Sequence, residues 1–258
     1  PLVDIGFGPH APYTVSDEPL IKIRTLANQL NIPIQIHLHE TEFEVSDAMD
    51  KTGLRPTERL SKLEFLGPDL QTVHMTQIDK HDIELLKKSN THVIHCPESN
   101  LKLASGFCPV HELQMAGINV ALGTDGSASN NDLDMIGEMR TAALIAKAVA
   151  KDASALPALE AIKMATINGA KALGKEDIIG SIKVGKQADL ISIDLSDLAS
   201  APVYNPISHI VYTATRNQVD HVWVAGKLHV KDKQLCNLNE QQLIKLAQQW
   251  ADKIQANL

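Results

Sequence analysis

Short runs of alternating hydrophobic and polar residues mark strands along the first half of the chain, and helical periodicity follows each run. The strand patterns are LVDIGFGPH (2–10), IPIQIHLHE (32–40), LQTVHM (70–75), THVIHCP (91–97) and INVALGTDG (118–126). Helical patterns follow at 16–31, 80–89, 110–116 and 133–151, and a longer acidic stretch leads to one that opens at Pro56. Strands that alternate with helices form right-handed βαβ units and a parallel sheet.

Each of these strands ends in a residue that can bind a metal or move a proton. The strand-end residues are His10, His37, His74, His95 and Asp125. A (β/α)8 barrel builds its active site from the carboxyl ends of different strands, whereas a doubly wound sheet uses one switch point. We therefore expect an α/β fold that contains about the last five units of a metal-dependent (β/α)8 TIM-like barrel, with three strands upstream of Pro1.

The pattern changes after a further helical segment at 157–173. Short β runs, separated by glycine and turn residues, follow at 180–194, 209–215 and 220–230. We expect the C-terminal portion of a barrel at 1–176, a small β-sandwich at 177–236 and a C-terminal helix at 237–258. The hydrophobic stripe of that helix, which we expect to pack on the body, consists of Leu243, Leu246, Trp250 and Ile254.

Net charge and hydropathy argue against two classes of partner, nucleic acid and membrane. The chain has 258 residues and a net charge of -7, which argues against binding to nucleic acid phosphates. No run approaches the roughly 20 apolar residues that a membrane span needs. Its three cysteines are scattered and form no CxxC pair, a usage typical of a reducing compartment. We expect a cytoplasmic protein whose partners include neither nucleic acid nor membrane.

The stretch IQIHLHE poses the central chemical question. His37 and His39 point to the same side of the strand, and Glu40 follows them. They could form part of a metal site or simply a polar strand end that meets water. The company of His74 and Asp125 favours a metal site for His37, since histidine, carboxylate and an open position make a catalytic zinc-type centre.

Several histidines and loops have ordinary explanations. A single histidine near a strand end is more often a surface or hydrogen-bonded residue than a ligand. This reading applies to His81, His92, His111, His209, His221 and His229. The GTDG stretch at 123–126 could be an Asp-Gly turn, and HCPESNLKL at 95–103 an ordinary polar loop.

Five motifs in order carry a family resemblance. They are GPHAPYT, HLHET, HCPESNLKLASG, LGTDGSASNNDLDM and GSIKVGKQADLISID. Together they resemble the amidohydrolase superfamily, and within it the branch of 5-methylthioadenosine/S-adenosylhomocysteine deaminases with related triazine and guanine hydrolases. The resemblance implies a distorted (β/α)8 barrel with a small β-sandwich formed by both ends of the chain.

The resemblance also implies roles for individual residues. His37 is the expected metal ligand, and Glu40 the acid/base that also contacts the purine ring. Asp125 is the expected last ligand, which accepts a proton from the water and faces the substrate. His74 is expected to orient the attacking water or stabilise the tetrahedral intermediate, and His10 to contact substrate.

Three further expectations complete the site. His39 falls on a position that varies in the family and is not expected to be a ligand. Ser99 and Asn100 are expected to shape the pocket. The family's remaining two ligands form an H-x-H pair on the first barrel strand, which this chain lacks.

We therefore expect one divalent ion, zinc first with Fe2+ or Mn2+ as alternatives, and a small-molecule nucleoside substrate. The expected reaction converts S-adenosylhomocysteine or 5-methylthioadenosine to the inosine analogue plus ammonia. Glu40 favours deamination, because loss of ammonia requires protonation of the amine. A guanine deaminase, a triazine hydrolase and a metal-free scaffold without the upstream ligands are the alternatives. A homodimer is expected from the resemblance alone.

Overall fold

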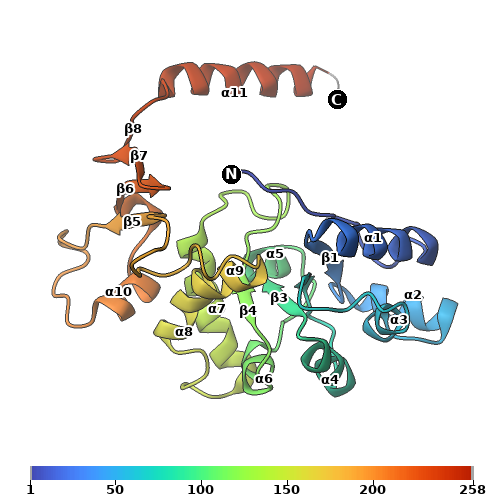
Figure 1. Ribbon diagram of the computed structural model, residues 1–258. Helices are drawn as coiled ribbons and strands as arrows, with labels where there is room; N and C mark the ends of the chain where they lie inside the picture. The colour runs from blue at the N-terminus through green and yellow to red at the C-terminus, as the bar shows by residue number, and fades with distance from the viewer. Residues whose placement is uncertain (1, 257–258) are drawn as a thin grey trace.

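The computed structural model describes residues 2–256 and contains a parallel sheet in the order β1-β2-β3-β4 (Figure 1). The strands are β1 (Ile34–Leu38), β2 (Leu70–His74), β3 (His92–His95) and β4 (Val120–Leu122). The register pairs Leu38 with His74 and His95 with Leu122, so neighbouring strands end at similar levels. The carboxyl ends of these strands therefore meet at one edge of the sheet.

The segment at 2–10, predicted to be a strand, is only partly paired with β1. Within the described residues its strand pairing is limited to an isolated bridge from Phe7 to Ile34. Pro9 has no N–H with which to continue a ladder. The His10 carbonyl still accepts a backbone hydrogen bond from β1 at 3.0 Å. The prediction of a full strand is wrong, but the segment does run beside β1 and carries His10 to its end.

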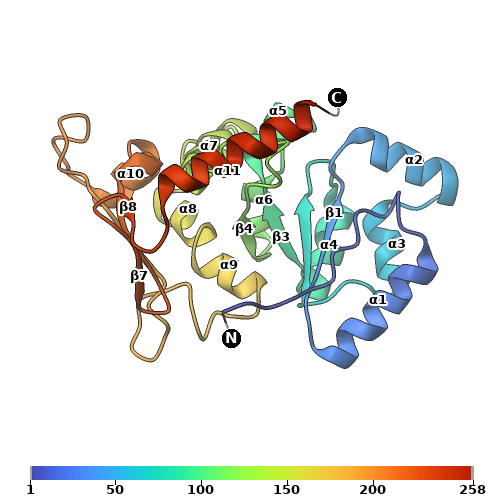
Figure 2. The same cartoon turned by 90° about the horizontal axis from the view of Figure 1, so that it is seen from above.

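Helices flank the sheet, as the alternating pattern predicted (Figures 1 and 2). They are α1 (Asp17–Leu30), α2 (Glu42–Thr52), α3 (Pro56–Lys62), α4 (Lys80–Ser89), α5 (Pro97–Lys102), α6 (Val110–Met115) and α7 (Met135–Ala150). Two of them, at 42–52 and 97–102, were not predicted, and the second lies in the stretch 95–103 that was interpreted as a polar loop. The helix predicted at 157–173 is divided into α8 (Ala158–Met164) and α9 (Ile167–Ala172). Thr166 separates them with non-helical angles of φ −132° and ψ −97°.

The hydrophobic core lies between the parallel sheet and its helices. Buried leucines of the helices, such as Leu20 and Leu86, join strand residues such as Ile36 in one cluster. Cys96 and Cys108 are also buried, and burial raises the pKa of both thiols above the usual range.

Residues after α9 form a separate antiparallel sheet of β5 (Leu190–Ile193), β6 (Val219–Val224), β7 (Lys227–Lys231) and β8 (Gln234–Leu235). This sheet lies within the predicted β-sandwich at 177–236, and the sandwich itself stays a prediction. The predicted β run at 209–215 is wrong, because most of it lies in α10 (Pro206–Tyr212), which precedes the short 3-10 helix η1 (Arg216–Gln218).

The last helix, α11 (Glu240–Gln255), stands apart from the parallel sheet (Figure 1), and all of its residues are exposed. The prediction that its hydrophobic stripe packs on the body is therefore wrong. None of the helices in residues 2–256 combines the length and hydrophobicity that crossing a membrane requires. The division at residues 176 and 236 remains a prediction.

Candidate metal centre

His37, His74 and Asp125 lie together at the carboxyl edge of the parallel sheet. They come from the end of β1, the end of β2 and the loop after β4. Each offers one ligand atom, and these atoms lie within 4.8 Å of one another. Ligands of a tetrahedral zinc ion lie roughly 3.3 Å apart, so small side-chain movements suffice to close the cluster around an ion. Two imidazoles and a carboxylate are donors that suit zinc.

His37 is oriented by the segment that precedes α1. Its Nδ1 donates to the His10 carbonyl oxygen at 2.7 Å. A carbonyl can only accept, so Nδ1 carries the hydrogen and Nε2 of the neutral ring is free to bind a metal. The ring also stacks on that of His74, with centroids 5.4 Å apart. His37 thus presents the nitrogen that a metal ligand requires.

His74 is buried and held by a pocket residue predicted from the sequence. Its Nδ1 lies 2.8 Å from Asn100 Oδ1, and its Nε2 lies 3.8 Å from Glu40 Oε2. Burial lowers the pKa of His74, against the opposing effect of the Glu40 charge. The neutral ring donates from Nδ1 to Asn100 and leaves Nε2 as an acceptor that faces the site.

Asp125 is fixed by two serine hydroxyls. Its Oδ2 accepts from Ser99 Oγ at 2.8 Å and from Ser129 Oγ at 2.5 Å. Burial alone would raise the pKa of Asp125, but these hydrogen bonds outweigh burial and lower it. A Cβ on Gly123 would lie 2.9 Å from Ile94 Cγ2, so glycine is needed where β4 leads into this loop. Asp125 is therefore a preorganised carboxylate.

Glu40 and His10 border the same cluster. Glu40 Oε1 accepts from Ser105 Oγ at 3.2 Å, and its side chain is 21% exposed. His10 is exposed, with its Nδ1 2.8 Å from Thr14 Oγ1 and its ring 5.2 Å from that of His37. An acid/base candidate and a substrate-facing candidate thus lie beside the three possible ligands.

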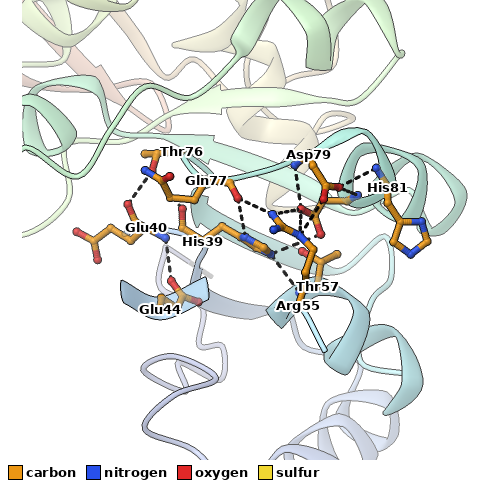
Figure 3. A network of polar contacts seen from close by, with 10 residues as sticks. His39, Glu40, Glu44, Arg55, Thr57, Thr76, Gln77, Asp79 and His81 are labelled. Atoms are coloured by element: carbon orange, nitrogen blue, oxygen red, sulfur yellow. Dashed lines mark hydrogen bonds and ion pairs between the residues drawn. The ribbon is translucent and has the colours of Figure 1, made fainter. Parts of the chain in front are cut away.

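Two further histidines near the strand ends, His39 and His95, lie outside this cluster. His39 is fully buried and is not among the three clustered donors. Its ring lies in a polar network with Thr57 and Gln77 (Figure 3). His95 is also buried, and its Nδ1 has no hydrogen-bond partner within the part of the chain that the structure describes. Burial, with a smaller effect of His74, lowers the pKa of His95 to about 3, so its ring is neutral.

Sequence reasoning missed three residues that support the site. Ser105 contacts Glu40, Ser129 contacts Asp125, and the buried carboxyl of Glu44 accepts the Glu40 backbone N–H at 2.8 Å. Burial raises the pKa of Glu44 to about 7. The serines lie in motifs that the family resemblance used, but Ser105 meets a residue 65 positions away, and the contact of Ser129 with Asp125 depends on the conformation of their shared loop. The sequence signal for Glu44 was the T-x-x-E spacing from Thr41, which is typical of a helix start.

Comparison with known protein families assigns the chain to one of them. The model of the amidohydrolase family matches residues 1–229. The chain belongs to the amidohydrolase family. The resemblance inferred from the five motifs is confirmed, and with it a metal-dependent, TIM-barrel-like α/β fold.

Two similar proteins are named as deaminases of adenine nucleosides. The chain is 56% identical over 255 residues to a 5-methylthioadenosine/S-adenosylhomocysteine deaminase of Saccharophagus degradans, a match that covers 99% of this chain and 57% of that protein. It is 44% identical over 253 residues to a 5'-deoxyadenosine deaminase of Methanopyrus kandleri, covering 98% and 58%. The chain therefore spans less than two thirds of the length of these relatives.

Solved structures agree on the fold. An adenosine deaminase from Xanthomonas campestris with bound zinc is 50% identical and has a TM-score of 0.98, covering 99% of this chain and 58% of that one. An atrazine chlorohydrolase from Arthrobacter aurescens complexed with zinc is 23% identical with a TM-score of 0.88, covering 92% and 52%. This second likeness shows the fold alone.

Proposed function

We propose that this chain carries the catalytic acid/base and part of the metal site of a hydrolytic deaminase that acts on an adenine-containing nucleoside. The observation that carries the proposal is the convergence of His37, His74 and Asp125 within 4.8 Å, with Glu40 beside them. The relatives named above, which act as deaminases by their names, support it.

His37 and Asp125 would hold a divalent ion, and zinc is the ion that we propose. The related solved structure at 50% identity contains zinc, and the donor atoms fit its preferences better than those of Mg2+ or Ca2+. A bound ion of this kind lowers the pKa of a coordinated water to about 7. We propose that two further ligands, an H-x-H pair by family resemblance, complete the site from outside residues 1–258.

Glu40 is the group placed to move protons. Deamination replaces the amino group of the ring with oxygen, so water must lose a proton and the amine must gain one before ammonia leaves. Glu40 Oε2 faces His74 Nε2 across 3.8 Å, a gap that leaves a carboxylate oxygen open to the reacting groups. Glu40 takes the proton from water and delivers it to the amine nitrogen, while Asp125 serves as a second acceptor.

His74 orients the water. Because its Nδ1 hydrogen is engaged by Asn100, the free Nε2 accepts a hydrogen bond from the attacking water. In this protonation state the ring cannot donate to a developing oxyanion. Of the two roles expected for His74 from the sequence, the hydrogen-bond pattern therefore supports orientation.

The substrate is proposed as S-adenosylhomocysteine, 5-methylthioadenosine or 5'-deoxyadenosine, the molecules in the names of the relatives. His10, exposed beside His37, is the residue that we propose to contact it. Guanine deamination and triazine hydrolysis remain the competing activities.

The test uses the full chain that the gene encodes. The purified protein is assayed for metal content and for ammonia release from the three adenine nucleosides, guanine and a chlorinated triazine, the last also assayed for chloride. The proposal expects a divalent metal and ammonia from at least one adenine nucleoside. Ammonia from guanine alone, or chloride from the triazine, would assign a competing activity. A metal-free, inactive protein would support a scaffold role.

A further inference from the structure

A single turn connects the proposed metal ligand to the proposed acid/base. His37 is the penultimate residue of β1, which ends at Leu38, and Glu40 lies two residues beyond that end. His39 between them has a φ of 53°, in the left-handed region that non-glycine residues rarely adopt. Such a conformation persists only where the surroundings hold it. The contacts that hold this turn therefore determine where the Glu40 side chain lies relative to His37.

Glu44 holds the turn from the helix side. It is 1% exposed, and its Oε2 accepts the Glu40 backbone N–H at 2.8 Å. In a usual capping box the acid bonds to the backbone N–H of the N-cap residue, which here is Thr41. The Glu44 carboxyl reaches one residue further back, to the acid/base itself. Burial of a carboxyl is costly unless its hydrogen bonds are used, and this bond is made to the backbone of the proposed catalytic residue.

His39 holds the same turn from the opposite side (Figure 3). Its Nδ1 lies 3.1 Å from the Gln77 carbonyl oxygen, and its Nε2 accepts the Thr57 backbone N–H at 3.2 Å. Its own carbonyl accepts the Gln77 backbone N–H at 3.1 Å and that of Thr76 at 2.9 Å. The turn is thereby connected to the start of α3 and to the loop after β2.

A second layer stabilises this network behind His39. Arg55 pairs with the fully buried Asp82 at 2.6 Å, and Asp82 Oδ1 lies 3.6 Å from His39 Nε2. Figure 3 shows Glu44 on one side of Glu40 and the His39 network on the other. The turn is thus fixed by buried polar groups that lie outside the candidate metal cluster.

We propose that Glu44 is a positioning residue that places Glu40 for proton transfer, with His39 bracing the same turn. The inference rests on the deaminase function proposed above. Its rival is that Glu44 merely stabilises the start of α2 as an acid in the first turn. Glu42 provides a matched control, because it is also an acid in the first turn of α2 and is exposed.

The experiment compares Glu44→Ala, Glu44→Asp, Glu44→Gln and Glu42→Ala in the full chain that the gene encodes, with its metal bound. We measure kcat, KM, metal content and hydrogen exchange at the Glu40 amide. Glu44→Ala should lower kcat by about 10- to 100-fold, with KM and metal content unchanged, and should speed exchange at the Glu40 amide. Glu44→Gln keeps an acceptor oxygen and should restore most of kcat, whereas Glu42→Ala should resemble the parent protein.

Glu44→Asp keeps the charge but is too short to reach the amide, and it tests the same point if Glu44→Ala does not fold. Equal losses of kcat in Glu44→Ala and Glu42→Ala would overturn the proposal in favour of a helix-end charge effect. Unchanged kcat despite faster Glu40 exchange would overturn it as well. An inactive parent protein would refute the deaminase function instead. In that case hydrogen exchange still tests the contact, and unchanged exchange at the Glu40 amide in Glu44→Ala would overturn the proposal that Glu44 holds the turn.

Discussion

At the residue scale, three residues at or beside the site have backbone angles in the left-handed region. His39, His74 and Asp125 have φ values of 53°, 80° and 63°. Each such residue costs about 1–3 kcal/mol and needs surrounding contacts to hold it. For His74 and Asp125 these contacts include Asn100, Ser99 and Ser129. Strain and support at the same strand ends are typical of a preorganised site.

The proton-transfer role of Glu40 predicts a separation of metal binding from turnover. Glu40→Gln should retain the metal content of the parent protein, because Glu40 is not among the three clustered donors. Its turnover should fall by about 100-fold or more, since an amide cannot shuttle a proton. Elemental analysis and ammonia release check both parts, and normal turnover would refute the role.

For His39 the structure changes the expected effect of substitution. Its absence from the proposed ligand set predicts that His39→Ala retains the metal. The ring is fully buried, however, and its loss leaves the Thr57 N–H and the Gln77 carbonyl without these partners. We expect His39→Ala to lower the free energy of unfolding by about 3 kcal/mol, measured by urea unfolding. His81→Ala, at an exposed position, should change it by less than about 0.5 kcal/mol.

Glu138 predicts a pH dependence of stability. This buried residue of α7 accepts the Glu98 backbone N–H at 3.2 Å and also bonds to Asn130, yet burial raises its pKa from 4.5 to about 8. Between those values the folded state keeps a proton that the unfolded state has lost. The contribution of Glu138 to stability is therefore present at low pH and declines as pH rises through this window.

Urea unfolding at about pH 5 and about pH 8 checks this sign. The parent protein should lose more stability over that interval than Glu138→Gln, which cannot titrate. Equal changes in the two proteins would contradict the assignment.

At the element scale, the strand ends and most helix boundaries followed from the sequence because side-chain period and caps are local signals. The start of α4 is an example, since Asp79 and Asp82 form a capping box there. The helix α2 was not predicted, because Glu44 is its only buried residue and its sequence therefore has no hydrophobic stripe. The T-x-x-E capping signal at Thr41 was available.

The helix α10 shows the opposite error. Its β-branched residues favoured a strand, but Asn205 caps the first turn through Ser208 N at 3.2 Å and Pro206 occupies the first position. Packing against α7 and α8 then completes the helix. The cap and the proline at its start therefore favour a helix here despite the β propensity of the residues that follow. The packing against α7 and α8 cannot be inferred from a single sequence.

Substitution of two glycines with the same φ separates the cost of backbone strain from the cost of close packing. Gly117 and Gly180 both have a φ of +83°, but a Cβ at Gly180 would lie 2.6 Å from Ala170 Cβ of α9, while one at Gly117 would meet nothing within 4 Å. Alanine at Gly117 should cost about 1 kcal/mol from backbone strain. Gly180→Ala should cost about 1–3 kcal/mol more through overpacking, as measured by thermal unfolding. Equal costs would mean that α9 moves freely.

At the scale of the whole molecule, the convergence of site residues from distant segments could be predicted only because parallel strands share one carboxyl edge. His37 and Asp125 are 88 positions apart by their numbers, and the barrel rule brought them together. The pairing of Ser99 and Ser129 with Asp125 could not be predicted, since it depends on loop conformation after the strands. The exposure of α11 could not be predicted either, because an amphipathic pattern does not indicate which surface packs against its hydrophobic side.

The exposed stripe of α11 gives a prediction of its own. Trp250 is 57% exposed, and the ammonium nitrogen of Lys253 lies 4.7 Å from the centroid of its ring. Trp250→Ala should therefore change the free energy of unfolding of this chain by only about 0.5 kcal/mol. A loss of several kcal/mol would mean that another surface covers the helix in solution.

The unequal burial of the three cysteines has a practical consequence. Cys96 and Cys108 lie in the core, where burial keeps their thiols protonated, whereas Cys236 is exposed just before α11. A maleimide dye should therefore attach to the native fold at one position. Placed there, the dye lies beside the uncovered helix and away from the metal cluster, so its emission would report what binds α11 without disturbing the chemistry.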